Sequence, residues 1–190
     1  MYGLIHSALR QMVLAEAGEG MWLEILQEAG VKPDVFLAMR ANDDAITFSL
    51  VGATAQSMDL SVGECLERFG RYWLVEYAPS VYGDLMSQTG TEVFEFLGYL
   101  NQLHERISTS FVNFRPPSFD VHVVSDDIIE FHYISPRLGL TPFVRGILYG
   151  LPEMFHCDLE VKELSTETTQ SGEHSVFLIS RESTTGVEHA

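Results

Sequence analysis

The spacing of apolar residues changes partway along this chain, from a helical repeat to the alternation of strands. In the first half, apolar side chains recur at intervals of three and four, which places them on one face of a helix. In the second half, segments rich in Val, Ile, Phe and Tyr alternate, as half-buried strands do. A chain ordered in this way is predicted to be α+β, with helices first and an antiparallel sheet after them.

The helical half carries clear start and stop signals. Gly18 and Gly20 separate the first two helices, and Ser61 with Glu64 forms the pattern of a capping box. Pro79 is expected to end the helix that Ser61 opens. The predicted helices cover residues 3–16, 21–29, 43–57, 61–78 and 91–108.

The second half contains two strand pairs and one helix. Ser125-Asp126-Asp127 joins the first pair, and a polar loop at 166–173 joins the second. Together the strands predict a four-stranded antiparallel sheet. The predicted elements are strands at 119–125, 128–135, 157–165 and 174–181, and a helix at 139–155.

Length and composition suit one globular domain of two lobes. The chain has 190 residues and is 46% hydrophobic, which is enough for a sizeable core. We expect a single domain over 1–182, with a helical lobe at about 1–60 and an α+β lobe at about 61–182. Residues 183–190 are expected to form a polar tail.

Net charge and cysteine content exclude several classes of protein. A formal charge of −16 opposes binding to nucleic acids and to anionic membranes. No signal peptide or long apolar run is visible, so we expect no membrane span. Only Cys65 and Cys157 occur, which indicates a reducing cytoplasm rather than a disulfide framework. Cys157 with His156 and His174 is too small a set to indicate a structural zinc site.

The run Tyr133-Ile134-Ser135-Pro136-Arg137 offers three polar groups on one side of an extended segment. An arginine guanidinium matches a carboxylate with two parallel hydrogen bonds. Alone, the run could be an exposed polar face at a strand end. With a partner site nearby, it could bind the carboxylates of an otherwise apolar ligand.

A histidine interrupts the apolar stripe of the predicted helix at 91–108. Val93, Leu97, Leu100 and Ile107 define the stripe, and His104 falls on it. A buried imidazole needs a partner, which is either a backbone carbonyl or a metal. The other histidines are expected to be surface or structural residues: His6, His122, His132, His156, His174 and His189.

The Tyr-x-Ser-x-Arg motif preceded by a helical histidine resembles the H-NOX domains, the haem-based sensors of nitric oxide and oxygen. These domains include the haem domain of animal soluble guanylate cyclase. The resemblance extends over nearly the whole chain, through matching segments at 1–5, 103–106 and 115–119. Within this family, the chain is similar to the stand-alone bacterial type.

The resemblance implies a cofactor and the residues that hold it. The cofactor is haem b, iron protoporphyrin IX, bound between the lobes, with His104 as the proximal iron ligand. Tyr133, Ser135 and Arg137 would bind the haem propionates. Pro117, which follows Pro116, and Ile5 would press on the porphyrin.

The resemblance also predicts which gas is bound. Oxygen-binding members carry a distal tyrosine nine residues after the motif tyrosine, and this chain has Pro142 there. Trp73, Leu74 and Phe143 are expected to give an apolar distal pocket. We therefore expect NO and CO to bind and oxygen to be excluded. The tyrosines that could alter this expectation are Tyr72, Tyr77 and Tyr149.

The expected function is gas sensing, with no catalysis in this chain. Release of His104 would pass the signal to a separate effector, a histidine kinase or a cyclic-di-GMP enzyme. No catalytic module follows the domain, so no cyclase or kinase activity is expected. The alternatives are an oxygen sensor, a haem enzyme of peroxidase type with Arg145 as the nearest acid–base candidate, and a haem-free interaction module.

Overall fold

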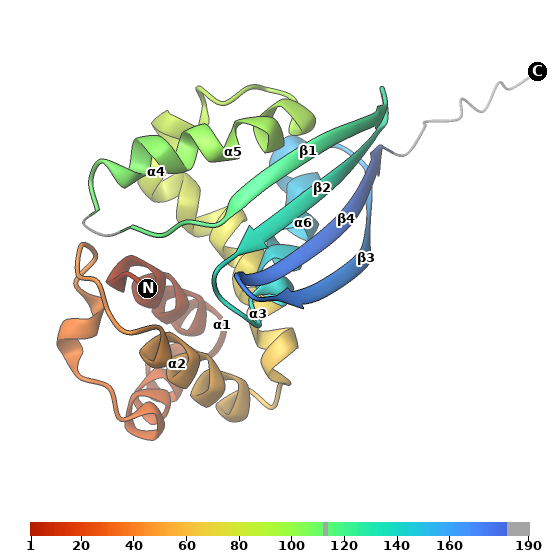
Figure 1. The fold of residues 1–190 in the computed structure, drawn as a ribbon. Helices are drawn as coiled ribbons and strands as arrows, with labels where there is room; N and C mark the ends of the chain where they lie inside the picture. Colours follow the sequence, from red (N-terminus) through yellow and green to blue (C-terminus); the bar gives the residue numbers. More distant parts are fainter. Residues whose placement is uncertain (112–113, 182–190) are drawn as a thin grey trace, which may run out of the picture.

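The computed structural model describes residues 1–111 and 114–181, and the predicted tail lies outside this range. The predicted α+β fold with a four-stranded antiparallel sheet is confirmed (Figure 1). The helical elements are α1 (Gly3–Ala29), η1 (Pro33–Phe36), α2 (Asp44–Ser57), α3 (Val62–Tyr72), the π-helix η2 (Trp73–Tyr77), α4 (Ala78–Met86), α5 (Val93–Ser108) and α6 (Thr141–Phe155). The strands are β1 (Ser118–Ser125), β2 (Ile128–Ser135), β3 (Leu159–Thr169) and β4 (Gly172–Arg181).

The sheet has the order β1-β2-β4-β3, with every neighbouring pair antiparallel. Its inner face buries alternate residues of β2, which are Ile129, Phe131 and Tyr133. Helix α6 lies behind the sheet in Figure 1 and covers this face, whereas the other face is open. The alternation of β2 therefore decides which of its side chains face the interior.

Helices α3 and α6 cross at a distance that only glycine allows. A Cβ atom added to Gly146 would lie 1.9 Å from the carbonyl oxygen of Glu67, and one added to Gly70 would lie 1.9 Å from that of Phe143. Because each glycine faces the backbone of the opposite helix, no side-chain movement could relieve these overlaps. The crossing brings η2, which continues α3, against α6.

Two of the predicted helix signals have the expected effect. Gly18 adopts φ 80°, in the left-handed region, and breaks the helical geometry of α1, which resumes and continues to Ala29. The capping box is confirmed: Ser61 Oγ accepts from the backbone N–H of Glu64 at 3.2 Å, and Glu64 Oε2 accepts from that of Ser61 at 2.8 Å.

Two predicted boundaries are wrong. The helix does not end at Pro79, because η2 leads directly into α4 and Pro79 lies in the first turn of α4. The expected loop at 166–173 is instead strand, since β3 and β4 continue to a tight turn. The sequence of this strand shows no apolar alternation, because β3 is largely solvent-exposed and carries polar residues there.

Two apolar clusters underlie the expected lobes. One joins α1, α2 and the start of α3, and the other joins α4, α5, α6 and the sheet. Phe69 belongs to the first cluster, Leu74 to the second, and Trp73 packs against both. The lobe boundary near residue 60 stays a prediction. Among the described helices, none combines the length and apolar character needed to cross a membrane.

Candidate functional site

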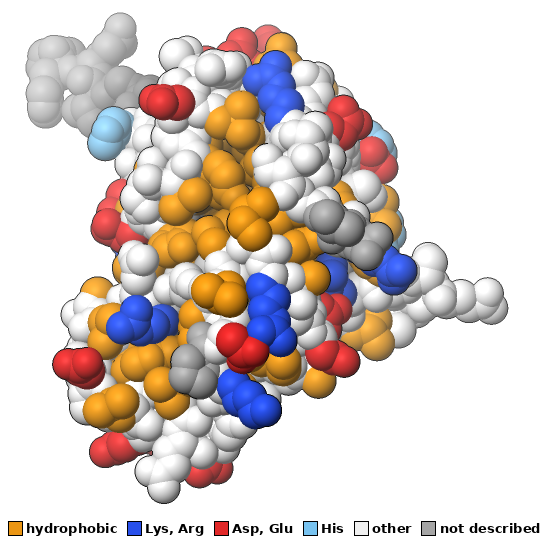
Figure 2. Space-filling model, turned by 90° about the vertical axis from the view of Figure 1, so that its left-hand side faces the viewer, with side chains coloured by type: hydrophobic (Ala, Val, Ile, Leu, Met, Phe, Trp, Pro, Cys, Tyr) orange, Lys and Arg blue, Asp and Glu red, His pale blue; other side chains and the backbone are white. Residues whose placement is uncertain are grey.

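A cavity of about 370 Å³ lies between the two clusters. This volume is within the roughly 300–1,000 Å³ of small-molecule pockets. In Figure 2, hydrophobic side chains form a band across the middle of the face that Figure 1 shows edge-on at its left. The apolar lining of the cavity includes Leu4, Ile5, Leu74, Met86, Phe96, Leu97, Leu100, Phe119, Phe131, Val144 and Leu148.

His104 of α5 lines this cavity and its Nδ1 atom is enclosed. Among the described residues, Nδ1 is the one buried side-chain nitrogen or oxygen without a hydrogen-bond partner. The ring stacks on Phe119 with 5.4 Å between centroids. Burial lowers the pKa of His104 to about 4, so the imidazole is neutral at pH 7. A neutral imidazole in the wall of an apolar cavity can serve as a metal ligand.

Tyr133 and Ser135 face the same cavity from the inner side of β2. Both are buried, with 2% and 3% of their surface exposed. Burial raises the pKa of Tyr133 to about 12, and a hydrogen bond with Ser135 opposes that shift. The phenol therefore keeps its proton at neutral pH and can donate it to a carboxylate.

Arg137 follows β2 and completes the polar end of the cavity. Its backbone N–H donates to Ser135 Oγ at 3.0 Å. The guanidinium donates from Nε to Asp44 at 2.7 Å and from Nη1 to the carbonyl of Arg115 at 2.7 Å. Asp44 also binds the N-terminal ammonium of Met1. The three motif residues therefore meet at one end of the cavity, as their alternation predicts.

The residues expected to press on a porphyrin also lie at the wall. Pro116 and Pro117 both line the cavity, as does Ile5 of α1. These side chains come from the segment before β1 and from the first turns of α1. The cavity therefore lies between the N-terminal helices and the rest of the molecule.

The expected distal residues lie at the wall contributed by η2 and α6. Trp73, Leu74 and Phe143 all line the cavity, and Tyr77 stacks on Trp73 at 5.3 Å without lining it. Pro142 is not a lining residue. The α6 side of the wall consists of apolar side chains: Leu140, Phe143, Val144, Ile147 and Leu148.

Tyr82 lines the cavity, and sequence reasoning missed it. It lies at an irregular position of α4, with φ −123°. Burial raises the pKa of Tyr82, with Tyr77 adding to the shift. Tyr72, Tyr77 and Tyr149, the tyrosines considered from the sequence, do not line the cavity. The helical repeat of apolar residues does not predict that Tyr82 lines the cavity, because the irregular backbone at Tyr82 determines where its side chain points.

Asp44 is the second residue that sequence reasoning missed, and α2 positions it. Asp43 caps α2 by accepting from Ala45 N at 2.9 Å, and Asp44 follows in the first turn. The desolvation of Asp44 acts to raise its pKa, but hydrogen bonds from the N-terminus and Arg137 outweigh it and lower the pKa. Asp44 is therefore ionised at neutral pH beside the guanidinium.

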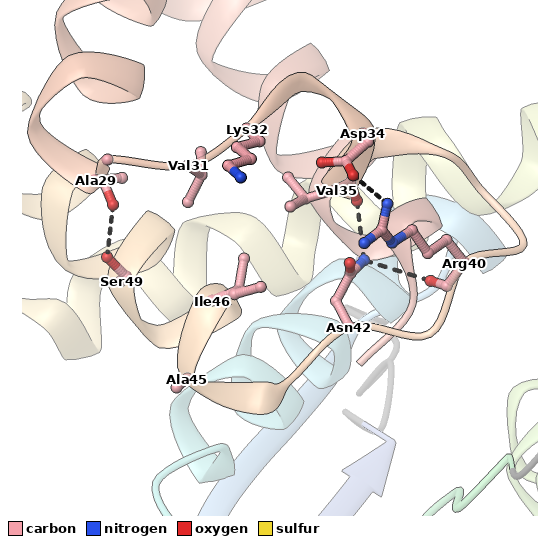
Figure 3. A pocket seen from close by; sticks show the side chains of 11 residues that line it. Ala29, Val31, Lys32, Asp34, Val35, Arg40, Asn42, Ala45, Ile46 and Ser49 are labelled. Atoms are coloured by element: carbon pink, nitrogen blue, oxygen red, sulfur yellow. Dashed lines mark hydrogen bonds and ion pairs between the residues drawn. The ribbon is translucent and has the colours of Figure 1, made fainter.

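A second hollow of about 420 Å³ lies between the end of α1 and the start of α2 (Figure 3). Its polar groups satisfy one another: Arg40 pairs with Asp34, Asn42 donates to the Val35 carbonyl at 3.0 Å, and Ser49 donates to the Ala29 carbonyl at 3.3 Å. Its lining contains no histidine or cysteine. The histidine and the other candidate ligand-binding side chains therefore belong to the apolar cavity.

The residues of the apolar cavity fit haem. The neutral imidazole of His104 suits the iron, apolar walls suit the porphyrin, and the Tyr133, Ser135 and Arg137 donors suit two propionates. The same residues do not suit peroxidase chemistry. Among the described residues, His104 is the only histidine of the lining, and Arg145 lies outside it, paired with Glu67 and Glu163. A distal acid–base pair is therefore not found there.

Comparison with known proteins gives a consistent result. The family model described as haem-NO-binding matches residues 2–163. Soluble guanylate cyclase gcy-35 of Caenorhabditis elegans is 28% identical over 193 residues, which cover 95% of this chain and 28% of that protein. Guanylate cyclase soluble subunit beta-2 of Rattus norvegicus is 30% identical over 119 residues, covering 60% of this chain and 17% of that protein. The chain thus spans about a quarter of the length of gcy-35.

Solved structures share the fold. An H-NOX protein from S. oneidensis in the Fe(II)NO state has a TM-score of 0.83 and 21% identity, with 96% of this chain and 99% of that chain covered. An oxygen-binding H-NOX domain related to soluble guanylate cyclases has a TM-score of 0.83 and 19% identity, with 96% and 95% covered. At these identities the likeness concerns the fold alone.

Proposed function

Because this chain belongs to the haem-NO-binding family of haem-based gas sensors, we propose that it holds haem b in the apolar cavity and senses NO. The observation that carries the proposal is the imidazole of His104 in the wall of an apolar cavity that Tyr133, Ser135 and Arg137 also line. When bound, haem would supply an iron centre that a diatomic gas can coordinate.

The chain would hold and orient the cofactor from three sides. His104 supplies the iron ligand from α5. Tyr133, Ser135 and Arg137 donate to the propionates, with Arg137 shared between this role and its bond to Asp44. Pro117 and Ile5 contact the porphyrin from the segment before β1 and from α1.

Gas selectivity would follow from the apolar side chains of η2 and α6. Leu74 and Phe143 have no hydrogen-bond donor in their side chains, and the indole N–H is the one side-chain donor of Trp73. Bound oxygen needs such a donor more than NO or CO does. We therefore propose that NO and CO bind and oxygen is excluded.

Signalling would use His104 as the moving part. If His104 left its ligand position, α5 would no longer be tied to the cofactor, and the contacts at Ile5 and Pro117 would relax. The N-terminal helices can then rotate, as a switch between two states requires. We propose a separate effector, a histidine kinase or a cyclic-di-GMP enzyme, of the kind used by stand-alone bacterial sensors.

We also propose a cytoplasmic location. Cys65 and Cys157 are both free thiols, as a reducing compartment would keep them. The acidic surface disfavours contact with anionic membranes and nucleic acids.

The deciding experiment is the absorption spectrum of the reduced, haem-loaded protein under argon, air, CO and NO. The proposal predicts changes in the Soret band with NO and CO and an unchanged band in air. A protein that purifies without haem, and does not take it up when haem is added, would contradict the cofactor assignment itself.

Tyr82 favours a second candidate, an oxygen sensor, because its phenol is a donor at the cavity wall. The Tyr82→Phe variant separates the two. For an oxygen sensor, wild type changes its spectrum in air and the variant does not. For the NO sensor proposed above, neither protein responds to air and both respond to NO.

A further inference from the structure

Three of the chain's seven histidines gather on the open face of the sheet, away from the haem cavity. His122 is on β1, His132 on β2 and His174 on β4. His132 precedes the buried Tyr133 and therefore points to the opposite side of β2. Glu130 of β2 lies on the same face, two residues from His132 and directly opposite His122 in the strand register.

The side chains of His122, Glu130 and His132 converge. One ligand atom from each lies within 4.8 Å of the other two. His132 Nε2 is 2.7 Å from Glu130 Oε1, and His122 Nδ1 is 3.8 Å from the same oxygen. The two imidazole rings of His122 and His132 are 4.6 Å apart between centroids.

The other nitrogen of His132 has a partner of its own. Its Nδ1 lies 2.9 Å from Nε2 of His174, and the two rings stack at 5.2 Å. In metal sites, the ring nitrogen that does not bind the ion is usually held by such a hydrogen bond, which fixes the orientation of the ring. The cluster therefore has both a converging set of ligands and a group that orients the central one.

We propose that His122, Glu130 and His132 bind one Zn²⁺ ion on the open face of the sheet, with His174 as a positioning residue. Two imidazoles and one carboxylate are a known zinc ligand set, which leaves a position for water. Ca²⁺ and Mg²⁺ prefer oxygen ligands and are disfavoured. Zinc bonds of about 2.0–2.1 Å place the ligand atoms about 3.3 Å from one another. Small side-chain rotations would bring the three ligand atoms to that separation. His122 can make them because 63% of its side chain is exposed.

This site would be independent of the haem and of gas binding. An ion there would tie β1 to β2 on the side opposite Tyr133. An ion at His122, Glu130 and His132 would be a second metal centre, separate from the iron proposed at His104.

The test is titration of the haem-loaded protein with Zn²⁺ in competition with a chromogenic chelator. We expect one equivalent of zinc per chain and no change in the Soret band. His122→Ala and His132→Ala should each weaken binding at least tenfold, and His174→Ala about 10–100-fold, as loss of an orienting group does. His156→Asn is the matched control, because His156 is an exposed histidine in the left-handed conformation that asparagine tolerates.

Circular dichroism should show that the His122→Ala protein folds normally, since this side chain is largely exposed. The proposal is overturned if wild type shows no saturable binding, or if the variant with both His122→Ala and His132→Ala binds zinc as wild type does. A Soret shift that parallels the zinc titration would place the ion at the haem and would also overturn it.

Discussion

Arg137 Nε donates a hydrogen bond to Asp44 Oδ2 at 2.7 Å and so joins the segment after β2 to the first turn of α2. The two residues are 93 positions apart in the chain. Both line the apolar cavity. The residue proposed to bind the propionates is thus also a contact between the N-terminal helices and the sheet.

Replacing Arg137 should weaken the retention of haem. Arg137→Ala removes the guanidinium from the polar end of the cavity, so haem should transfer to apomyoglobin at least several-fold faster than from wild type. Arg71→Ala is the control, since Arg71 forms an exposed ion pair with Glu153 away from the cavity. Equal transfer rates for wild type and Arg137→Ala would contradict the propionate role.

Replacing His104 should remove the iron ligand and leave the cavity. His104→Gly is expected to change the spectrum of the haem-loaded protein, and added imidazole should restore it by entering the vacated space. Glycine in a helix costs about 1 kcal/mol, so Gln102→Gly, at an exposed position of α5, controls for that effect. A wild-type spectrum of His104→Gly without imidazole would rule out the ligand role.

The crossing of α3 and α6 should not tolerate a methyl group. Gly146→Ala places Cβ 1.9 Å from the Glu67 carbonyl, which forces the helices apart and should lower the free energy of unfolding by about 1–3 kcal/mol. Gly52→Ala in α2 meets open space and should instead be neutral or stabilising by up to about 1 kcal/mol. Urea unfolding measures both. A stable Gly146→Ala protein would show that the helices can separate at little cost.

Stability should fall as the pH drops below about 6.5 because of His6. This residue is fully buried, and burial lowers its pKa from the value of 6.5, outweighing the hydrogen bond to the Val35 carbonyl. The unfolded chain therefore binds a proton more readily, and stability is lost from pH 6.5 down through the folded pKa. Urea unfolding of His6→Gln should show a shallower decline over this range than wild type or the control His156→Asn. An identical decline in all three proteins would contradict this account.

His6 also illustrates what the sequence could not decide. It was expected to be a surface or structural histidine. The structure buries it, with Nδ1 3.0 Å from the Val35 carbonyl and Nε2 2.7 Å from Thr47 Oγ1. The partners come from η1 and α2, and no local pattern around His6 specifies them.

The predicted secondary structure was accurate where periodicity and capping signals agree. The capping box at Ser61 and the strands at Ser118–Ser125 and Ile128–Ser135 are examples. The predicted helix end at Pro79 was wrong because a π-helical segment intervenes and changes the register that a regular helix would keep. The same irregular region, through Tyr82 in α4, contributes a cavity residue that the sequence did not reveal.

The sequence by itself determined which faces are apolar and which carry polar groups: His104 on the stripe of its helix, and Tyr133 and Ser135 on one side of their strand. Local periodicity is sufficient for this, because side-chain direction repeats with backbone geometry. Only the tertiary structure decided that α5, β2 and the N-terminus of α2 enclose one cavity. That arrangement depends on contacts between distant segments, such as Arg137 with Asp44 and Gly146 with the backbone of α3, and the packing of the whole chain decides which surfaces meet.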